Sequence, residues 1–196
     1  MAKTIIALVG PIASGKGTVA DILGEHGFEH VSFSDRIREE IKSRGMEVTR
    51  ETLNLVSNEL RETHGSEIWA KKTAKKISES DYDKFVVDGA RNPAEIQFLK
   101  QTLGLKLIAL TGDQRRRYEL FIKRAVNSQP MTFEEFKDLD DKELNGSEGE
   151  HSQRVQDCMD MADFTVENNG TIEDLKAKVE EILTQISGPS QNRTGV

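Results

Sequence analysis

The chain has 196 residues, of which 36% are hydrophobic and 31% are charged, and its formal net charge is −7. This length suits one domain with a substantial core, and we expect a cytoplasmic protein, because a single cysteine cannot build a disulfide framework and neither a secretory leader nor a membrane-spanning run is recognisable. The negative charge argues against a protein that coats nucleic-acid phosphates, since such proteins need a basic face.

The hydrophobic pattern predicts alternating strands and helices in one domain that covers residues 1–186. Strands are expected at 4–9, 29–33, 84–88, 105–110 and 163–166. Helices are expected at 15–26, 35–44, 49–63, 66–79, 92–102, 113–125 and 171–186. Short apolar strands separated by helices are typical of an α/β fold with a five-stranded parallel sheet flanked by helices. Ligands bind such sheets beyond the carboxyl ends of the strands.

Two stretches interrupt this alternation, and a third ends it. Residues 36–80 insert several helices between the second and third strands. Residues 126–160 are polar and acidic, with only a short amphipathic piece, and we expect them to form a mobile lid. Residues 187–196 are small and polar, and we expect a disordered tail.

The segment that follows the first expected strand reads Gly-Pro-Ile-Ala-Ser-Gly-Lys-Gly-Thr, residues 10–18, and precedes a helix. This order is typical of a phosphate-binding loop (Walker A), in which glycines let the backbone amides turn toward phosphate oxygens and the helix dipole favours negative charge. Lys16 would reach the outer phosphates. The alternative is a Gly-rich turn with one exposed lysine. The loop predicts ATP binding by Gly10, Ala13, Ser14, Gly15, Lys16, Gly17 and Thr18.

One position of this loop bears on the metal. Gly17 stands where the general pattern has Ser or Thr as a magnesium ligand, and the hydroxyl comes one residue later, at Thr18. We therefore expect Mg²⁺ to be held by phosphates, water and a carboxylate from elsewhere. The sequence contains no Asn-Lys-x-Asp motif for guanine, which argues against a signalling GTPase. The Gly-Lys-Gly-Thr form resembles the adenylate kinase branch of P-loop proteins.

Residues 30–41 resemble the adenylate kinase segment His-Ile-Ser-Thr-Gly-Asp-x-Leu-Arg, which opens the domain for the phosphate acceptor. The resemblance implies that residues 36–80 bind the acceptor and that Arg38 holds its phosphate. Asp35 is suited to cap a helix whose first turn then carries Arg38, and a guanidinium there could bind a phosphate through two hydrogen bonds. The alternative is that Arg38 pairs with a glutamate on a surface helix.

Residues 85–92 resemble the adenylate kinase run that ends Asp-Gly-Phe-Pro-Arg, with one residue fewer between Gly89 and Arg91. The resemblance implies that Asp88 orders a magnesium-bound water beside the loop. It also implies that Gly89 lets a substrate approach the backbone and that Arg91 binds the acceptor phosphate. An ordinary Asp-Gly turn after a strand is the alternative.

Residues 117–130 resemble the helix that leads into the lid of adenylate kinases. The resemblance implies that Arg124 is a catalytic arginine. Leu120 replaces another arginine of that pattern, so contact with the adenine would pass to Arg116 or Arg117. The alternative is that these arginines are solvated surface residues.

Residues 162–171 resemble the last strand and turn of several P-loop kinases, and this resemblance implies that Asn168 lies near the donor adenine. The alternative is a turn asparagine selected for its backbone conformation. In motif order, residues 4–186 most resemble an archaeal family of adenylate-kinase-related proteins.

The resemblance implies an ATP- and Mg²⁺-dependent kinase that acts on a small phosphorylated acceptor, with a nucleoside monophosphate as the first choice. The implied catalytic residues are Lys16, Asp88, Arg91 and Arg124, and the implied acceptor site is Asp35, Arg38, Gly89 and Arg91. We expect no nucleic-acid and no membrane partner, and no feature indicates a protein partner.

Two other functions remain open. A kinase for dephospho-CoA would phosphorylate a hydroxyl and need a base, for which Asp35 is the candidate. An ATP-binding regulatory or assembly factor would hydrolyse ATP slowly and act through a protein partner.

Overall fold

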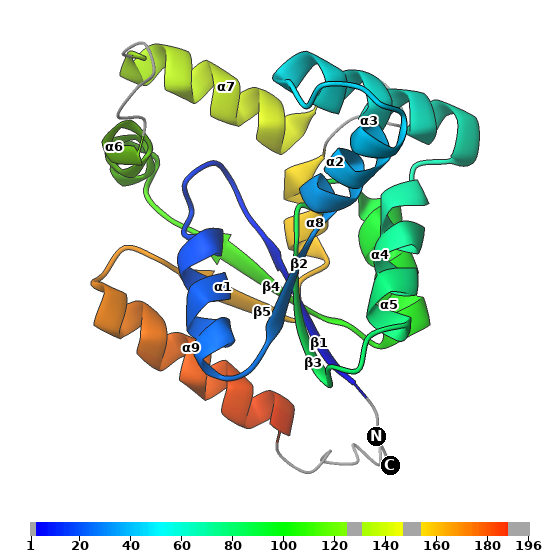
Figure 1. The fold of residues 1–196 in the computed structure, drawn as a ribbon. Helices are drawn as coiled ribbons and strands as arrows, with labels where there is room; N and C mark the ends of the chain where they lie inside the picture. Colours follow the sequence, from blue (N-terminus) through cyan, green and yellow to red (C-terminus); the bar gives the residue numbers. More distant parts are fainter. Residues whose placement is uncertain (1–2, 125–130, 147–153, 188–196) are drawn as a thin grey trace, which may run out of the picture.

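A computed structural model describes residues 3–124, 131–146 and 154–187 (Figure 1). Its five strands form one sheet in the order β2-β3-β1-β4-β5, and every neighbouring pair is parallel. The strands are β1 (Thr4–Val9), β2 (Glu29–Ser32), β3 (Lys84–Asp88), β4 (Lys106–Thr111) and β5 (Phe164–Glu167). The predicted five-stranded parallel sheet is therefore confirmed, with each strand within one residue of its expected ends.

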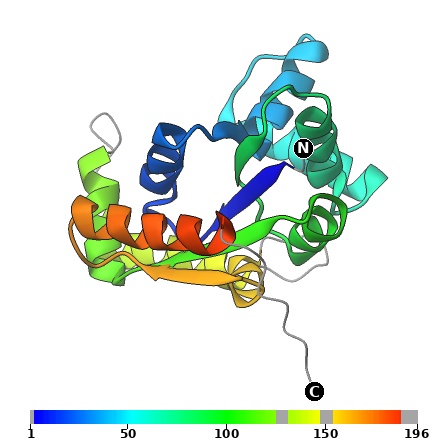
Figure 2. The ribbon, with the colours of Figure 1, turned by 90° about the horizontal axis from the view of Figure 1, so that it is seen from below.

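Nine helices lie in the described ranges and cover both faces of this sheet (Figures 1 and 2). They are α1 (Lys16–Glu25), α2 (Phe33–Ser43), α3 (Arg50–His64), α4 (Ile68–Ser78), α5 (Pro93–Leu103), α6 (Gln114–Arg124), α7 (Phe133–Asn145), α8 (Val155–Asp160) and α9 (Ile172–Ser187). None of these helices is long and apolar enough to span a lipid bilayer.

The central strand β1 divides the core into two parts because successive side chains of a strand point to opposite faces. Ile6 and Leu8 pack with α1 and α9 on one face. Ile5, Ala7 and Val9 pack on the other face with buried side chains of α2, α3, α4, α5 and α8. All five residues are buried, which explains why β1 is a continuous apolar run rather than an alternating one.

Local capping explains most helix starts. Asn92 and Glu95 form a capping box at the start of α5, with Pro93 in its first turn, and Thr49 and Thr52 form another at α3. The start of α2 differs from the prediction, which placed it at residue 35 with Asp35 as a cap.

The helix α2 begins two residues earlier than expected. The Ser32 hydroxyl accepts the Ser34 N–H at 3.1 Å and caps the helix, so Asp35 lies within the first turn. Ser32 also ends β2, and the chain passes from strand to helix without a loop. This direct passage holds the start of α2 at the carboxyl end of the sheet.

The two predicted insertions contain regular helices. The stretch between β2 and β3 folds into α2, α3 and α4. The described part of residues 126–160 forms α7 and α8, which is more helix than the expected short amphipathic piece. In Figure 1, α7 crosses above the end of the sheet where the phosphate-binding loop lies. Ser187, the first residue of the expected tail, is the last of α9, and residues 188–196 lie outside the described part of the chain.

Candidate active site

The carboxyl ends of three neighbouring strands meet at Asp88. In the sheet register Asp88 of β3 is paired with Leu8 of β1 on one side and with Ser32 of β2 on the other. The phosphate-binding loop follows β1 directly, so parallel pairing alone brings Asp88 beside it. This edge of the sheet is where open α/β folds bind ligands.

The backbone of the phosphate-binding loop has the left-handed turns that its sequence allows. Ala13 has φ of 57° and Gly15 has φ of 103°. A Cβ atom added at Gly15 would lie 2.4 Å from Nδ2 of Asn168, so only glycine fits there. The same Nδ2 donates to the carbonyl oxygen of Ser14 at 2.9 Å and ties the loop to the turn after β5. The helix α1 starts at Lys16 without a side-chain cap, which leaves its first amides directed at the loop.

The Lys16 side chain folds back over the loop. Its Nζ donates to the carbonyl oxygens of Gly10 at 2.8 Å and Pro11 at 3.0 Å. Burial lowers the pKa of the Lys16 ammonium below its usual value, and the nearby carboxylates of Asp88 and Glu143 oppose that shift. The two carboxylates therefore offset part of the cost of burying the Lys16 charge.

A small cavity of about 80 Å³ lies in front of the loop. Among the predicted site residues it brings together Gly10, Lys16, Asp88, Gly89 and Arg91. Gly89 has φ of 96°, and a Cβ atom there would lie 3.2 Å from Cβ of a buried phenylalanine of α2, so glycine is favoured at this position as well. The polar side chains that line the cavity are Lys16, Ser32, Ser34, Asp88, Arg91 and Glu143.

The structure does not bring Asp35, Arg38 or Arg124 into this cavity. Nη1 of Arg38 lies 3.0 Å from Oδ1 of Asp35, and about half of each side chain is exposed. Arg124 is exposed at the last residue of α6. Their assignment to the acceptor and to the transferring phosphoryl group stays a prediction.

Two adjacent arginines predicted to contact adenine have different surroundings. Arg116 lies against the turn after β5, where it donates to the carbonyl oxygen of Gly170. Arg117 is 5% exposed and forms two hydrogen bonds of 2.7 Å with the carboxylate of Asp140 on α7. Arg116 therefore contacts the turn after β5 and Arg117 contacts α7, and their assignment to the adenine stays a prediction.

Sequence reasoning missed the acidic side of the site, which comes from α7. Asp140 is fully buried, and Glu143 lines the cavity at 3.2 Å from the guanidinium of Arg91. The buried Phe136 shares their face, because residues 136, 140 and 143 follow the i, i+4, i+7 spacing of one helix face. This spacing was the signal in the sequence that could have found the two carboxylates, because acidic residues on the same helix face as a core phenylalanine point toward the protein interior.

A second missed group holds the loop that carries Arg91. Glu95 is fully buried and accepts the backbone N–H of Arg91 at 2.9 Å and that of Asn92 at 3.1 Å. Its other oxygen accepts from Nη2 of Arg61 on α3 at 3.0 Å, and Arg61 also donates to the Ser57 hydroxyl at 2.7 Å. Burial raises the pKa of Glu95, while Arg61 and the two amides oppose the shift. The helical insertion is thus joined to the backbone of Arg91.

The residues present fit a magnesium nucleotide. The Ser14 hydroxyl is buried within the loop and has no hydrogen-bond partner in the described part of the chain. The carboxylate of Asp88 reaches the same cavity as Lys16, and Thr18 lies in the first turn of α1. Together they supply donors for phosphate and oxygen ligands of the kind that Mg²⁺ takes.

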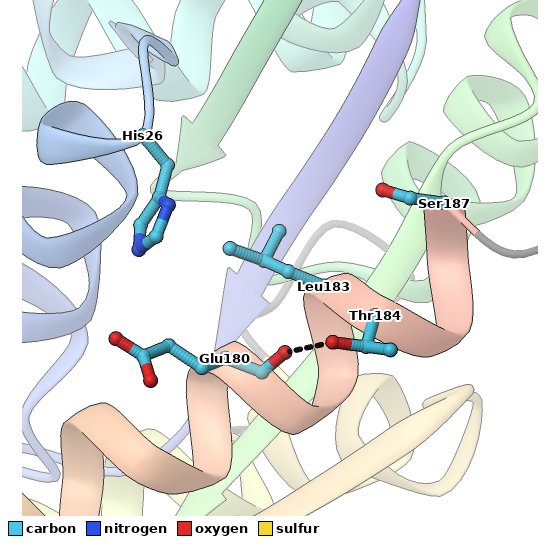
Figure 3. Close-up of a pocket in the computed structure, with 5 residues that line it drawn as sticks. All are labelled: His26, Glu180, Leu183, Thr184 and Ser187. Atoms are coloured by element: carbon cyan, nitrogen blue, oxygen red, sulfur yellow. Dashed lines mark hydrogen bonds between the residues drawn. The ribbon is translucent and has the colours of Figure 1, made fainter.

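A larger cavity of about 520 Å³ lies at the opposite end of α1, next to α9 (Figure 3). His26 projects from the end of α1 toward α9, where Thr184 donates to the carbonyl oxygen of Glu180 at 2.9 Å. None of the predicted site residues lines this cavity. Since α1 spans ten residues, about 15 Å of helix separates it from Lys16.

Comparison with known proteins places this site in a family. The chain is 31% identical to a UPF0200 protein of Hyperthermus butylicus over 95% of this chain and 96% of that protein. It is 34% identical to a UPF0200 protein of Pyrococcus horikoshii, covering 93% and 97% of the two chains. The chain belongs to the UPF0200 family. A longer UPF0200/UPF0201 protein of Archaeoglobus fulgidus is 37% identical, and this UPF0200 chain spans 56% of its length.

A family profile described as an AAA domain matches residues 9–111 of this UPF0200 chain, which is more than half of its length. TT1252 of Thermus thermophilus shares the fold with a TM-score of 0.64 and 17% sequence identity, covering 96% of this chain and 100% of that one. A shikimate kinase of Bacteroides thetaiotaomicron has a TM-score of 0.59 and 13% identity, covering 92% and 98% of the two chains. A gluconokinase of Sinorhizobium meliloti has a TM-score of 0.54 and 15% identity, covering 94% and 98% of the two chains. The predicted P-loop kinase-like fold and the predicted archaeal family are both confirmed.

Proposed function

We propose that this protein is an ATP-dependent kinase that transfers a phosphoryl group to a small phosphorylated acceptor, and that the acceptor is a nucleoside monophosphate. The observation that carries the proposal is the single cavity in which Lys16 of the phosphate-binding loop, Asp88 and Arg91 meet. Phosphoryl transfer needs the donor and the acceptor positioned in line and the charge on the transferring group neutralised, and it needs little covalent chemistry from side chains.

On the donor side, the amides of residues 12–18 and the ammonium of Lys16 would hold the β- and γ-phosphates of ATP. Lys16 would leave the carbonyl oxygens of Gly10 and Pro11 to do so. Bound Mg²⁺ would supply positive charge between these phosphates, and Asp88 is the carboxylate suited to order its water shell. Arg116, bonded to the turn after β5, and Asn168, bonded to the loop, would contact the base.

On the acceptor side, Arg91 would hold the acceptor phosphate across the cavity from Lys16. Glu95 supports this role, because its carboxylate accepts the backbone N–H of Arg91 and holds that segment in place. A phosphate acceptor is already an anion at neutral pH, so it needs no general base. Arg38, at the start of the helical insertion, and Arg124 would join the site only after a rearrangement of their surroundings.

One observation favours a second acceptor class, a hydroxyl. The carboxylates of Asp88 and Glu143 both line the cavity, and either could accept a hydroxyl proton. Asp35, the base expected for a dephospho-CoA kinase, is instead paired with Arg38 outside it. Two of the proteins that share this fold are named as a shikimate kinase and a gluconokinase.

A coupled assay tests these alternatives. ADP formation is followed with Mg²⁺-ATP and a panel of nucleoside monophosphates, dephospho-CoA, shikimate and gluconate, with Lys16→Met as the inactive control. Stimulation by a nucleoside monophosphate supports the first proposal, and stimulation by an unphosphorylated hydroxyl compound supports the second. Slow ATP hydrolysis that no acceptor stimulates would overturn both and favour a regulatory factor.

A further inference from the structure

Three cations at or near the phosphate-binding loop already have partners within the protein, and for two of them the partner is a carboxylate of α7. Lys16 is bonded to carbonyl oxygens of its own loop. Arg91 is paired with Glu143, and Arg117 is paired with Asp140. In adenylate-kinase-like enzymes a lid is expected to bring cations to the nucleotide, whereas this helix brings anions to the loop.

Asp140 makes the tightest of these contacts. Its Oδ1 accepts the backbone N–H of Ile12, within the phosphate-binding loop, at 3.1 Å. Both of its oxygens accept from Arg117 at 2.7 Å, and Oδ2 also accepts from Nε2 of Gln114 at 3.0 Å. Arg117 in turn donates to the carbonyl oxygen of Ile12 at 2.9 Å. A loop amide and an arginine fork converge on one anion, which is the donor arrangement that a phosphate group requires.

Glu143 occupies the equivalent place on the acceptor side. Its Oε1 lies 3.2 Å from Nη1 of Arg91, its side chain is 17% exposed, and its charge acts on Lys16. It comes three residues after Asp140 on the same helix face. The helix α7 therefore presents one carboxylate, Glu143, to the cavity and a second, Asp140, to the phosphate-binding loop at Ile12.

We propose that Asp140 and Glu143 act as internal substitutes for the substrate phosphates and hold α7 over the phosphate-binding loop until nucleotide displaces them. This inference rests on the proposed function, since it assigns the same cavity to phosphates. Incoming phosphate takes over the Ile12 amide and the guanidinium of Arg117, and its charge repels both carboxylates. The helix α7 then moves off the loop, and the loss of these contacts lowers the net binding free energy of ATP.

The test replaces charge while keeping shape. Asp140→Asn retains an oxygen for the Ile12 amide and for Arg117, and Glu143→Gln retains one for Arg91. Affinities for Mg²⁺-ATP and for inorganic tripolyphosphate are measured by calorimetry on the full chain. We expect each to bind about tenfold more tightly to Asp140→Asn, because a like charge that opposes the ligand has been removed. Asp138→Asn, an exposed carboxylate on the same helix, is the matched control and should leave both affinities unchanged.

A second measurement follows α7 itself. Spin labels at Asp138→Cys on α7 and Glu181→Cys on α9, both exposed positions, report the separation of the two helices. ATP should change the distance distribution of the otherwise wild-type protein, and the double variant Asp140→Asn, Glu143→Gln should show part of that change without ATP. Thermal melting of every variant confirms that it is folded.

Three outcomes would overturn the inference. If Asp140→Asn binds ATP as tightly as the parent or more weakly while remaining folded, Asp140 is a structural residue and the proposed kinase function stands. If ATP leaves the label distances unchanged, α7 does not move. If ATP and tripolyphosphate bind to none of the folded variants, the proposed function fails together with this inference.

Discussion

The two walls of the cavity in front of the phosphate-binding loop are built in different ways. The sheet wall consists of Lys16, Asp88 and Arg91, which follow strand ends or a strand-to-helix turn. The α7 wall consists of Glu143, with Asp140 next to the cavity on Ile12 and Arg117, and their helix follows α6 rather than a strand end. The position of the sheet wall is determined by local sequence and sheet register. The position of the α7 wall depends on ion pairs, which we propose that a ligand replaces. The predictions below test this division.

The largest effect is expected on the sheet wall. Lys16→Met should lower kcat by about a thousandfold or more, because the ammonium is the main protein charge on the transferring phosphoryl group. The fold should persist, since within the described ranges Lys16 donates hydrogen bonds only to its own loop. Turnover with the best acceptor and circular dichroism check both points. Turnover near that of the parent would show that the sheet wall does not carry the chemistry.

Arg91→Ala comes next and separates donor from acceptor. We expect the acceptor KM to rise about ten- to a hundredfold, because a charge-assisted pair to phosphate is lost, with the ATP affinity nearly unchanged. Steady-state kinetics at saturating ATP give the acceptor KM, and calorimetry with ATP alone gives the ATP affinity. An unchanged acceptor KM would place the acceptor away from Arg91.

Gly15→Ala tests the rigidity of the loop. The φ of 103° and the 2.4 Å approach to Nδ2 of Asn168 leave no room for a methyl group, so we expect a loss of about 1–3 kcal/mol of stability. Gly17→Ala is the matched control, because a Cβ atom there meets nothing within 4 Å. Denaturant unfolding compares the two, and equal stabilities would show that the brace from Asn168 is not needed.

The smallest effect concerns α8, whose first residue, Val155, lines the cavity. Burial raises the pKa of Cys158 to about 12, so the thiol stays protonated at neutral pH in the folded protein. A disulfide reagent at pH 8 should therefore modify Cys158 only as fast as the protein unfolds. Rapid reaction in native buffer, against a denatured control, would show that α8 opens as readily as we propose for α7.

The same division explains how far the sequence could predict this molecule. The loop from Gly10 to Thr18 and the turn at Asp88 were predictable, because a strand, a turn and a helix follow each other within a few residues. The start of α2 was misplaced by two residues, since Ser32 serves as both strand end and helix cap.

The α7 wall was not predictable in the same way. Ile12 and Asp140 are separated by 128 residues, and the pairing of Arg117 with Asp140 requires α6 and α7 to be placed first. A single sequence records neither placement. Arg117 was therefore assigned to the adenine, and Asp140 was not singled out.

The hydrogen bond from Asn168 to Ser14 joins the phosphate-binding loop to the far end of the sheet. The segment matched to the AAA domain ends at residue 111, so it contains the whole loop but not the amide that steadies it. A truncated chain ending there would also expose the flank of β4 that β5 covers. A shortened version of this protein that keeps the loop braced must therefore extend past β5 to Asn168, and α9 is needed as well because it packs in one core cluster with Ile6 and Leu8 of β1.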